Sequence, residues 1–154
     1  MNNEELKQRI LTIVPKAEFV EGGQYLTAII PKEKINPLGK ALKESPDTAF
    51  DYLFCQSGVD YPTFMTVVYH LESTIHHHCL VLKVNTNDRI DPQIPTVMDI
   101  WRTAEYHERE IFDFFGINFK NHSDMRRIFL DEIIDEIGHP FRKDYSDPVN
   151  IIER

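Results

Sequence analysis

The sequence predicts an α+β domain with a mainly antiparallel or mixed sheet of four to five strands, helices packed against the sheet, and an extended C-terminal arm. Strand patterns dominate the middle of the chain and helical patterns follow them, with one helical pattern before the strands and one between them. This order is typical of an α+β domain. A length of 154 residues with 42% hydrophobic residues suffices for one core. We expect a single domain over residues 1–145 and a tail over 146–154.

The N-terminal region predicts a short helix and a hairpin. Asn2 and the two glutamates that follow Asn3 provide an N-cap and an acidic first turn, and apolar residues recur at helical spacing until Pro15. Two extended runs, 18–21 and 24–30, flank a Gly-Gly pair. Such a pair is typical of a tight hairpin turn.

The middle of the chain predicts one helix and three strands. Residues 32–44 have helical spacing, and Pro37 is compatible with a helix there if the helix begins near it. Extended patterns follow over 50–57, 64–71 and 77–84. The last two alternate apolar and polar residues, so we expect them to pair as a hairpin with one buried face.

The last third predicts a loop and three helices. Residues 85–95 are rich in Asn, Asp and Pro, which indicates a loop. Helical spacing then predicts helices over 96–101, 103–115 and 125–134. In the second of these helices, the apolar residues fall on one stripe.

Net charge and cysteine usage exclude several functions. The net charge of −8 opposes binding to nucleic acid or anionic lipid. The chain has no apolar run near the ~20 residues that span a bilayer and no signal-peptide core, so we expect it in the cytoplasm.

Cys55 and Cys79, expected as buried free thiols, cannot supply the four thiolates of an iron–sulfur cluster. Glycine-rich nucleotide-binding motifs are also lacking.

The histidines and carboxylates form no complete ligand or catalytic set. His76 and His78 share one face of an extended segment, but zinc requires three or four ligands, and we interpret the segment as the polar start of a strand. His122 and His139 lack further ligands in the same way. The acidic pairs within 131–136 are expected to form a solvated ridge. No pairing rule selects two acid–base catalysts from the four candidate carboxylates: Glu108, Asp113, Asp131 and Asp135.

Charged and aromatic residues are mixed along residues 101–145, which hold more than half of the chain's aromatic residues. A solvated helix separates the two kinds onto opposite faces, so the mixture indicates ion pairs within an apolar interface. Glu108 projects from the apolar stripe of the predicted helix. Because an unpaired buried carboxylate costs several kcal/mol, we expect a cation beside it. The candidates for that cation are Arg126, Arg127 and Arg142.

Arg109 and the C-terminal arm allow simpler interpretations. Arg109 lies four residues from both Glu105 and Asp113, which predicts surface ion pairs. The segment 141–145 follows Pro140, which favours an extended backbone. It predicts either an arm that lies on a partner protein or an arm that folds back on its own domain, with Arg142 beside Glu108.

Three motifs occur in this region. They are E-R-E-x-x-D-x-x-G-I-x-F over residues 108–119, H-S-D-M-R-R-I over 122–128 and F-R-K-D-Y over 141–145. With them the chain resembles the thirty-kilodalton subunit of the proton-pumping NADH:quinone oxidoreductase called respiratory complex I. Weaker similarity extends upstream through Asp60-Tyr61-Pro62, Tyr69-His70-Leu71 and Asp99-Ile100-Trp101.

The chain departs from the family pattern at three positions. Ser123 replaces the usual proline, Asn121 the usual glycine and Phe141 the usual leucine. These changes alter the stiffness of the local backbone and keep every charged position. We therefore expect a shifted interface rather than a lost one.

The resemblance implies an accessory, non-redox subunit of the hydrophilic arm, on the cytoplasmic side of the membrane and peripheral to it. Its implied partners are the large quinone-site subunit and the cluster-bearing subunit near it. It implies no cofactor in this chain, with NADH, FMN, iron–sulfur clusters and quinone in partner subunits. The implied interface and ion-pair residues are Glu108, Arg109, Glu110, Asp113, His122, Asp124, Arg126, Arg127, Arg142, Lys143, Asp144 and Tyr145.

Two other functions stay open at this point. Through the same motifs, the chain also resembles the equivalent subunit of a membrane-bound, energy-converting hydrogenase. A stand-alone binding or metal-dependent module would use the segment His76–His78 and would require a third ligand to converge on it.

Overall fold

The computed structural model describes residues 2–130 and 138–147, and every structural statement below concerns these residues. Within them it contains three α-helices, one short 3-10 helix and seven strands. In chain order the elements are α1 (Asn3–Ile13), β1 (Glu18–Val20), β2 (Leu26–Ile30), η1 (Lys32–Lys34), α2 (Ile35–Glu44), β3 (Tyr52–Asp60), β4 (Met65–Ser73), β5 (His78–Thr86), β6 (Gln93–Pro95), α3 (Ala104–Phe115) and β7 (Asn118–Lys120).

The main sheet has five strands in the order β1-β2-β5-β4-β3. The β2–β5 pair is parallel and the other three pairs are antiparallel, so the sheet is mixed. A second, two-stranded parallel sheet joins β6 and β7. The predicted α+β class and both predicted hairpins are confirmed.

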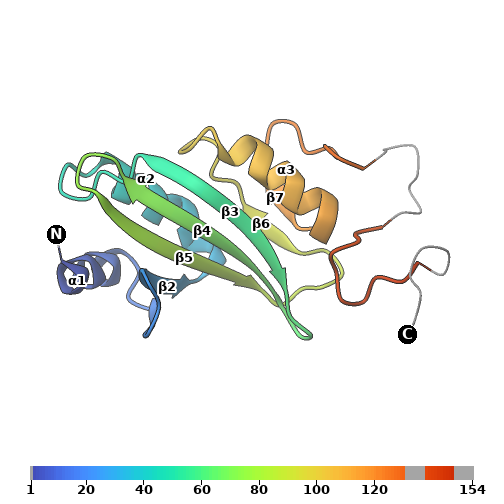
Figure 1. Ribbon diagram of the computed structural model, residues 1–154, viewed down its shortest axis with the longest axis horizontal. Coiled ribbons are helices and arrows are strands. Elements are labelled where there is room, and N and C mark those ends of the chain that lie inside the picture. The colour runs from blue at the N-terminus through green and yellow to red at the C-terminus, as the bar shows by residue number, and fades with distance from the viewer. Residues whose placement is uncertain (1, 131–137, 148–154) are drawn as a thin grey trace.

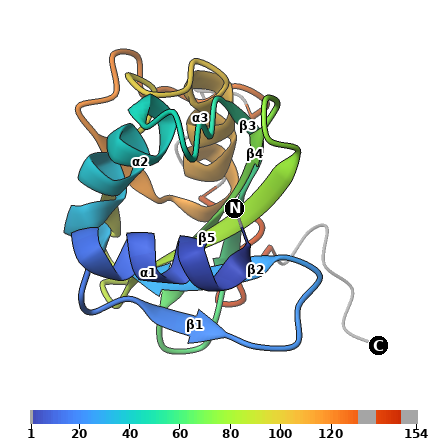
Figure 2. The ribbon, with the colours of Figure 1, turned by 90° about the vertical axis from the view of Figure 1, so that its left-hand side faces the viewer.

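The helices lie on one face of the main sheet, with α1 and α2 behind β2 and β5 and with α3 beside β3 (Figures 1 and 2). The core forms between this face and the helices. Alternate residues of β4, among them Val67, Tyr69 and Leu71, are fully buried there. Their neighbours in the strand point to the opposite face, as the period of two requires.

Local sequence explains where α1 begins and where α3 ends. Asn2 and Glu5 form a capping box at the start of α1, in which each side chain accepts from the other's backbone N–H. The helix α3 ends at Gly116, which has φ +74. A Cβ atom there would lie 2.5 Å from the His139 ring, so glycine also permits close packing of the arm.

Two predicted helices are wrong. Residues 97–101 form a turn, because the N–H of Thr96 binds the Lys120 carbonyl and the N–H of Val97 binds the Glu108 carboxyl. Residues 125–130 are also non-helical, because the N–H groups of 128–130 bind the Asp113 carboxylate. The remaining predicted part, 131–134, lies outside the described residues, as does the predicted acidic ridge.

The predicted loop 85–95 and the predicted thiols also need correction. The strand β5 continues to Thr86, and residues 93–95 form β6 because they pair with β7. Cys55 and Cys79 are free thiols, but they are half-buried. Cys55 is on β3 and Cys79 is on β5. Both lie on the face of the sheet that no described helix covers.

Candidate protein-protein interface

The Glu108 carboxyl is fully buried on α3. Its Oε1 accepts a hydrogen bond of 2.9 Å from the Val97 N–H, and its Oε2 accepts from the Thr96 hydroxyl. The three candidate arginines for that position, Arg126, Arg127 and Arg142, all bind other groups in the described structure. The predicted ion pair is therefore wrong, because the turn after β6 satisfies this carboxyl with neutral donors.

Burial raises the pKa of Glu108 to about 7, although the hydrogen bonds from Thr96 and Val97 and the nearby Gln56 amide lower it in part. The His122 Nε2 lies 4.0 Å from Oε2. His122 accepts a hydrogen bond at Nδ1 from the Asp124 N–H, and its Nε2 faces the Glu105 carbonyl at 3.0 Å. Because Nδ1 accepts, the ring proton is on Nε2. Among the described residues, no lysine or arginine side chain pairs with the Glu108 carboxyl.

Asp113 organises the loop that follows β7. Its Oδ2 accepts hydrogen bonds from three consecutive backbone N–H groups, those of residues 128–130, at 3.2, 2.8 and 3.0 Å. Its Oδ1 accepts from Arg127 Nη1 at 2.9 Å, and Arg127 Nη2 donates to the Gly138 carbonyl. Burial raises the pKa of Asp113, but these hydrogen bonds outweigh it and hold the pKa below its usual value.

Arg109 supports the same loop from the side of α3. Its Nε and Nη2 donate to the carbonyls of Arg126 and Arg127 at 3.2 and 3.0 Å. Its nearest carboxylate is that of Asp124, at 4.0 Å. The predicted surface pairs of Arg109 with Glu105 and Asp113 are thus wrong, because the returning loop covers Arg109. Arg126 is 62% exposed and pairs with Asp124.

The arm 138–147 folds back on its own domain, and the contact is made through Asp60 at the end of β3. The buried Asp60 carboxylate pairs with Arg89 and accepts from the Lys143 N–H at 2.7 Å. Arg142 binds Asp144 and the Arg89 carbonyl. The fold-back alternative therefore holds, but the expected contact of Arg142 with Glu108 is wrong. The Arg142 guanidinium, partly opposed by burial, brings the pKa of Asp144 to about 2.

The other residues of the arm make fewer polar contacts. The Lys143 side chain is exposed, and Tyr145 donates its backbone N–H to the Arg142 carbonyl at 3.1 Å. Phe141 donates its backbone N–H to the Phe114 carbonyl at 3.1 Å, which attaches the arm to the end of α3.

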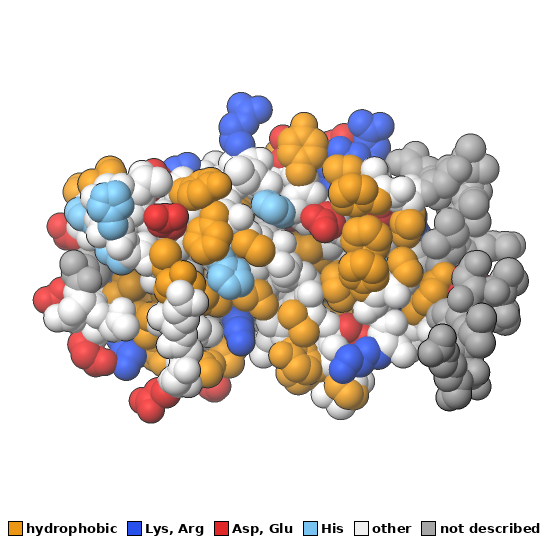
Figure 3. Space-filling view, viewed as in Figure 1, with side chains coloured by type: hydrophobic (Ala, Val, Ile, Leu, Met, Phe, Trp, Pro, Cys, Tyr) orange, Lys and Arg blue, Asp and Glu red, His pale blue; other side chains and the backbone are white. Residues whose placement is uncertain are grey.

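Three phenylalanines form an exposed stack, here called the aromatic stack. Phe114 stacks on Phe141 at 4.3 Å and on Phe129 at 5.6 Å between ring centroids. Phe129 and Phe141 are 64% and 58% exposed. Hydrophobic side chains gather where α3 meets the arm (Figure 3). Large exposed apolar patches of this kind are typical of protein interfaces.

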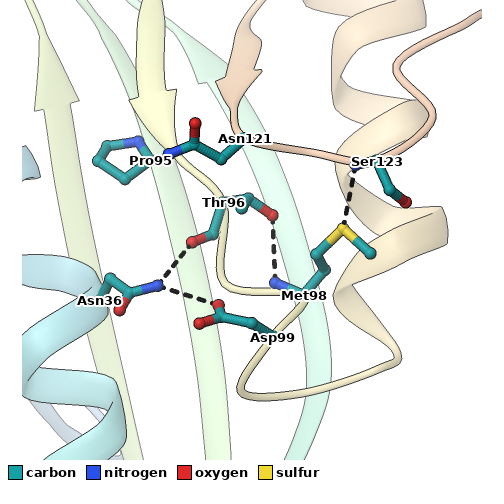
Figure 4. Close-up of a pocket in the computed structure, with 7 residues that line it drawn as sticks. All are labelled: Asn36, Pro95, Thr96, Met98, Asp99, Asn121 and Ser123. Carbon is teal, nitrogen blue, oxygen red and sulfur yellow. Dashed lines mark hydrogen bonds between the residues drawn. The ribbon is translucent and has the colours of Figure 1, made fainter.

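A cavity of about 470 Å³ lies where α2 meets the turn after β6. The Asn36 amide donates to the Thr96 carbonyl at 3.1 Å and to Asp99 at 3.0 Å (Figure 4). The Ser123 N–H contacts the Met98 sulfur at 3.4 Å, and Met98 donates its N–H to the Thr96 hydroxyl. These bonds fix the position of Thr96, and thereby the donor that reaches Glu108.

The histidine-rich segment has structural contacts. The rings of His76 and His78 stack at 5.6 Å, and His76 Nε2 contacts the Pro46 carbonyl at 2.7 Å. His139 lies against the carbonyl of Asp113 at one end of α3, whereas His122 contacts the other end. Within the described ranges, no group of three His, Cys, Asp or Glu residues is placed to hold a metal ion. None of the helices in those ranges is long and apolar enough to cross a membrane.

The predicted site residues thus fall into separate groups. Around the loop 122–130 lie Arg109, Asp113, His122, Asp124, Arg126 and Arg127, and the arm holds Arg142, Lys143, Asp144 and Tyr145. Glu110 is exposed. Glu108 is buried, and of the two groups only His122 lies near its carboxyl, at 4.0 Å. Sequence reasoning missed Gln56, Thr96 and Arg89 as contact residues. It also missed the role of Asp60, although the Asp60-Tyr61-Pro62 similarity was available.

The fold and this surface are typical of a subunit that functions through contact with other proteins. Residues 28–149 match the family described as respiratory-chain NADH dehydrogenase, 30 Kd subunit. The chain belongs to this family. The resemblance drawn from the three motifs is therefore confirmed.

Named relatives agree with the family. The C subunit of NADH-quinone oxidoreductase from Cupriavidus pinatubonensis is 33% identical over 92% of this chain and 76% of that protein. The C subunit from Chloroherpeton thalassium is 45% identical over 68% of this chain and 43% of its own length. The C/D subunit from Phocaeicola vulgatus is 41% identical over 79% of this chain. This chain spans only 23% of the length of that C/D protein.

A solved structure has the same fold. It is part of the membrane-bound sulfane sulfur reductase, described as an archaeal respiratory membrane complex. The TM-score is 0.77 at 30% identity, and the match covers 93% of this chain and 85% of that one.

Proposed function

We propose that the chain is an accessory, non-redox subunit of the peripheral arm of an NADH:quinone oxidoreductase, which couples electron transfer from NADH to quinone to proton translocation. The observation that carries this proposal is the aromatic stack. Its two outer rings are exposed, and the buried Asp113–Arg127 pair fixes the loop that presents Phe129. An ordered loop loses little conformational entropy when a partner binds, which favours a permanent contact.

The proposed role is to hold neighbouring redox subunits in position. Its partners are other subunits of the complex, chiefly the large quinone-site subunit and the cluster-bearing subunit near it. NADH, FMN, iron–sulfur clusters and quinone belong to these partners, and this chain carries out no electron transfer. The chain is peripheral to the membrane, on its cytoplasmic side, and is attached through the complex. The family match over residues 28–149 supports this role.

Co-purification tests the role directly. The affinity-tagged chain is expressed in its own host and purified, and the associated subunits are identified by mass spectrometry. Phe129→Ser should reduce recovery of the quinone-site subunit about tenfold or more, because buried aromatic residues at interfaces contribute about 2 kcal/mol or more. Ile75→Ser is the matched control, since Ile75 is 69% exposed and lies far along the chain in the turn between β4 and β5. Equal recovery with both variants would contradict the proposed surface.

Activity measurements separate assembly from catalysis. Arg127→Ala should lower the amount of assembled complex while turnover per assembled complex stays near the wild-type value. Normal assembly with a collapse of turnover would instead indicate a direct catalytic role.

The alternative function, the equivalent subunit of an energy-converting hydrogenase, has less support. The 30% identical structure belongs to a respiratory membrane complex that is named as a sulfane sulfur reductase and not as a hydrogenase. The purified complex decides between them: NADH-dependent quinone reduction supports the first function, and hydrogen-dependent reduction the second.

A further inference from the structure

A second cavity, of about 230 Å³, lies between β3, α3 and the arm. It reaches the surface, because two of its lining residues, Glu110 and Phe141, are exposed. The lining residues that matter here are Gln56, Gly58, Glu110, Phe114, Phe115 and Phe141.

The walls of this cavity are aromatic. Phe141 stacks on Phe114 with an interplanar angle of 10°, and it meets Phe115 edge to face at 83°. Phe115 lies directly over Gly58, where a Cβ atom would approach its ring to 2.6 Å. The sheet side of the cavity wall is therefore rigid. The faces of these phenylalanine rings carry the negative part of the aromatic quadrupole and attract cations.

The Gln56 side chain is the polar group at the sheet side of the cavity. It is 3% exposed, and neither of its amide atoms has a hydrogen-bond partner among the described residues. The Gln56 amide lies close enough to the Glu108 carboxyl to lower the pKa of that carboxyl. The amide oxygen has no donor among the described residues. A buried acceptor without a donor costs about 1–3 kcal/mol, so a ligand with N–H groups would be favoured.

The rim of the cavity is anionic. Glu110 is exposed, and its carboxylate has no ion pair or hydrogen bond within the part of the chain that the structure describes. The neighbouring Arg109 does not neutralise it, because its guanidinium binds the carbonyls of residues 126 and 127. The chain as a whole has a net charge of −8, which also favours a cationic ligand.

We propose that this cavity binds the guanidinium group of an arginine side chain from a neighbouring subunit. The assignment of the arginine to a subunit rests on the proposed function, whereas the chemistry of the cavity does not. A planar guanidinium can stack on Phe141, donate two hydrogen bonds to Glu110 and still donate to the Gln56 oxygen. An apolar side chain would leave the Gln56 oxygen unsatisfied. An ammonium group is attracted to the ring face as well, but it lacks the planar fork of donors that reaches Glu110 and Gln56 together.

Nuclear magnetic resonance of the purified chain tests the cavity without a partner. The probe is ethylguanidinium chloride, and ethylammonium chloride at equal concentration controls for ionic strength and for charge. Saturable shifts are expected at the Gln56 side-chain amide and the Phe141 ring with ethylguanidinium only. Absence of these shifts would overturn the proposal, as would equal shifts with ethylammonium.

Variants test the individual contacts. Glu110→Gln should weaken ethylguanidinium binding up to about fivefold, the range expected of an exposed ion pair. Phe141→Leu should weaken it further by removing the ring face. Glu33→Gln removes an exposed carboxylate elsewhere and should leave binding unchanged. If Glu33→Gln weakens binding as much as Glu110→Gln does, the cavity is not the site and the proposal fails.

Co-purification with the wild-type chain and Glu110→Gln then separates this inference from the proposed function. Recovery of the quinone-site subunit with both chains, together with no probe binding, would refute the arginine cavity and leave the proposed function in place. Probe binding without recovery of any neighbouring subunit would refute the proposed function and keep the cavity. Probe binding together with lower recovery for Glu110→Gln is the expected result.

Discussion

The hydroxyl of Thr96 donates a hydrogen bond to Oε2 of Glu108, and this bond connects the turn after β6 to the interior of α3. The carboxyl is 0% exposed, and none of the arginines in the described chain reaches it. It is therefore stabilised by neutral donors, which compensate for lost hydration only in part.

This arrangement makes stability depend on pH between about 4.5 and 7. The pKa of Glu108 is raised from 4.5 to about 7, so in this range the folded chain keeps a proton that the unfolded chain releases. The free energy of unfolding should therefore fall as pH rises from 4.5 to 7, by about 3 kcal/mol for this group, and level off above 7. Urea unfolding at pH 5, 6, 7 and 8 measures this fall.

The variant Glu108→Gln isolates this contribution. Its amide is neutral at every pH, so the difference in unfolding free energy between wild type and variant should change by about 3 kcal/mol across the range. The variant's unfolding free energy is subtracted from that of the wild type because His70 and His78 also titrate. Burial lowers their pKa, so their contribution makes the unfolding free energy rise with pH, opposite to that of Glu108. Glu110→Gln, exposed on the same helix, is the control. A pH-independent difference for Glu108→Gln would show that this carboxyl does not titrate in the range.

Asp113→Asn should destabilise the loop 122–130. The change removes the buried charge opposite Arg127 and weakens the acceptor for three backbone N–H groups. Breaking a buried pair costs about 3–5 kcal/mol, and urea unfolding should show a loss of this order. Hydrogen exchange should also accelerate at residues 128–130. Asp124→Asn, in an exposed pair, should cost less than about 1 kcal/mol; similar losses for the two variants would count against this account.

Asp60→Asn should release the arm while the core stays folded. The buried Asp60 carboxylate holds Arg89 and the Lys143 N–H. Burial raises the pKa of Asp60, but these contacts hold it below the usual value, so wild-type attachment should also weaken as pH falls through that low pKa. Limited proteolysis should cleave residues 138–147 about tenfold faster in the variant. Asp51→Asn, which loses contacts to Thr74 only, should leave the rate unchanged.

Gly58→Ala should strain the contact between β3 and α3. The added Cβ would lie 2.6 Å from the Phe115 ring, which must move. Overpacking of this kind costs about 1–3 kcal/mol. Thermal unfolding should show the loss, and Ser57→Ala, at the adjacent exposed position, should not. An unchanged melting temperature for Gly58→Ala would mean that Phe115 moves without cost.

The sequence by itself determined most elements and the family. Apolar residues at helical spacing indicated α1, α2 and α3, and alternation indicated β4 and β5, because these periods follow from backbone geometry and hold wherever a chain has one buried face. The three motifs of the last third identified the family, because each motif is a short run of residues that can be read from the sequence without the fold.

Only the tertiary structure decided what the charged groups contact. Glu108 was expected to meet an arginine, but the turn at residues 96–97 reaches it first with a hydroxyl and a backbone N–H. The N–H groups of 128–130 bind Asp113 where sequence reasoning placed a helix. A buried carboxylate competes for any donor that the fold brings near, and sequence spacing does not reveal which donor that will be.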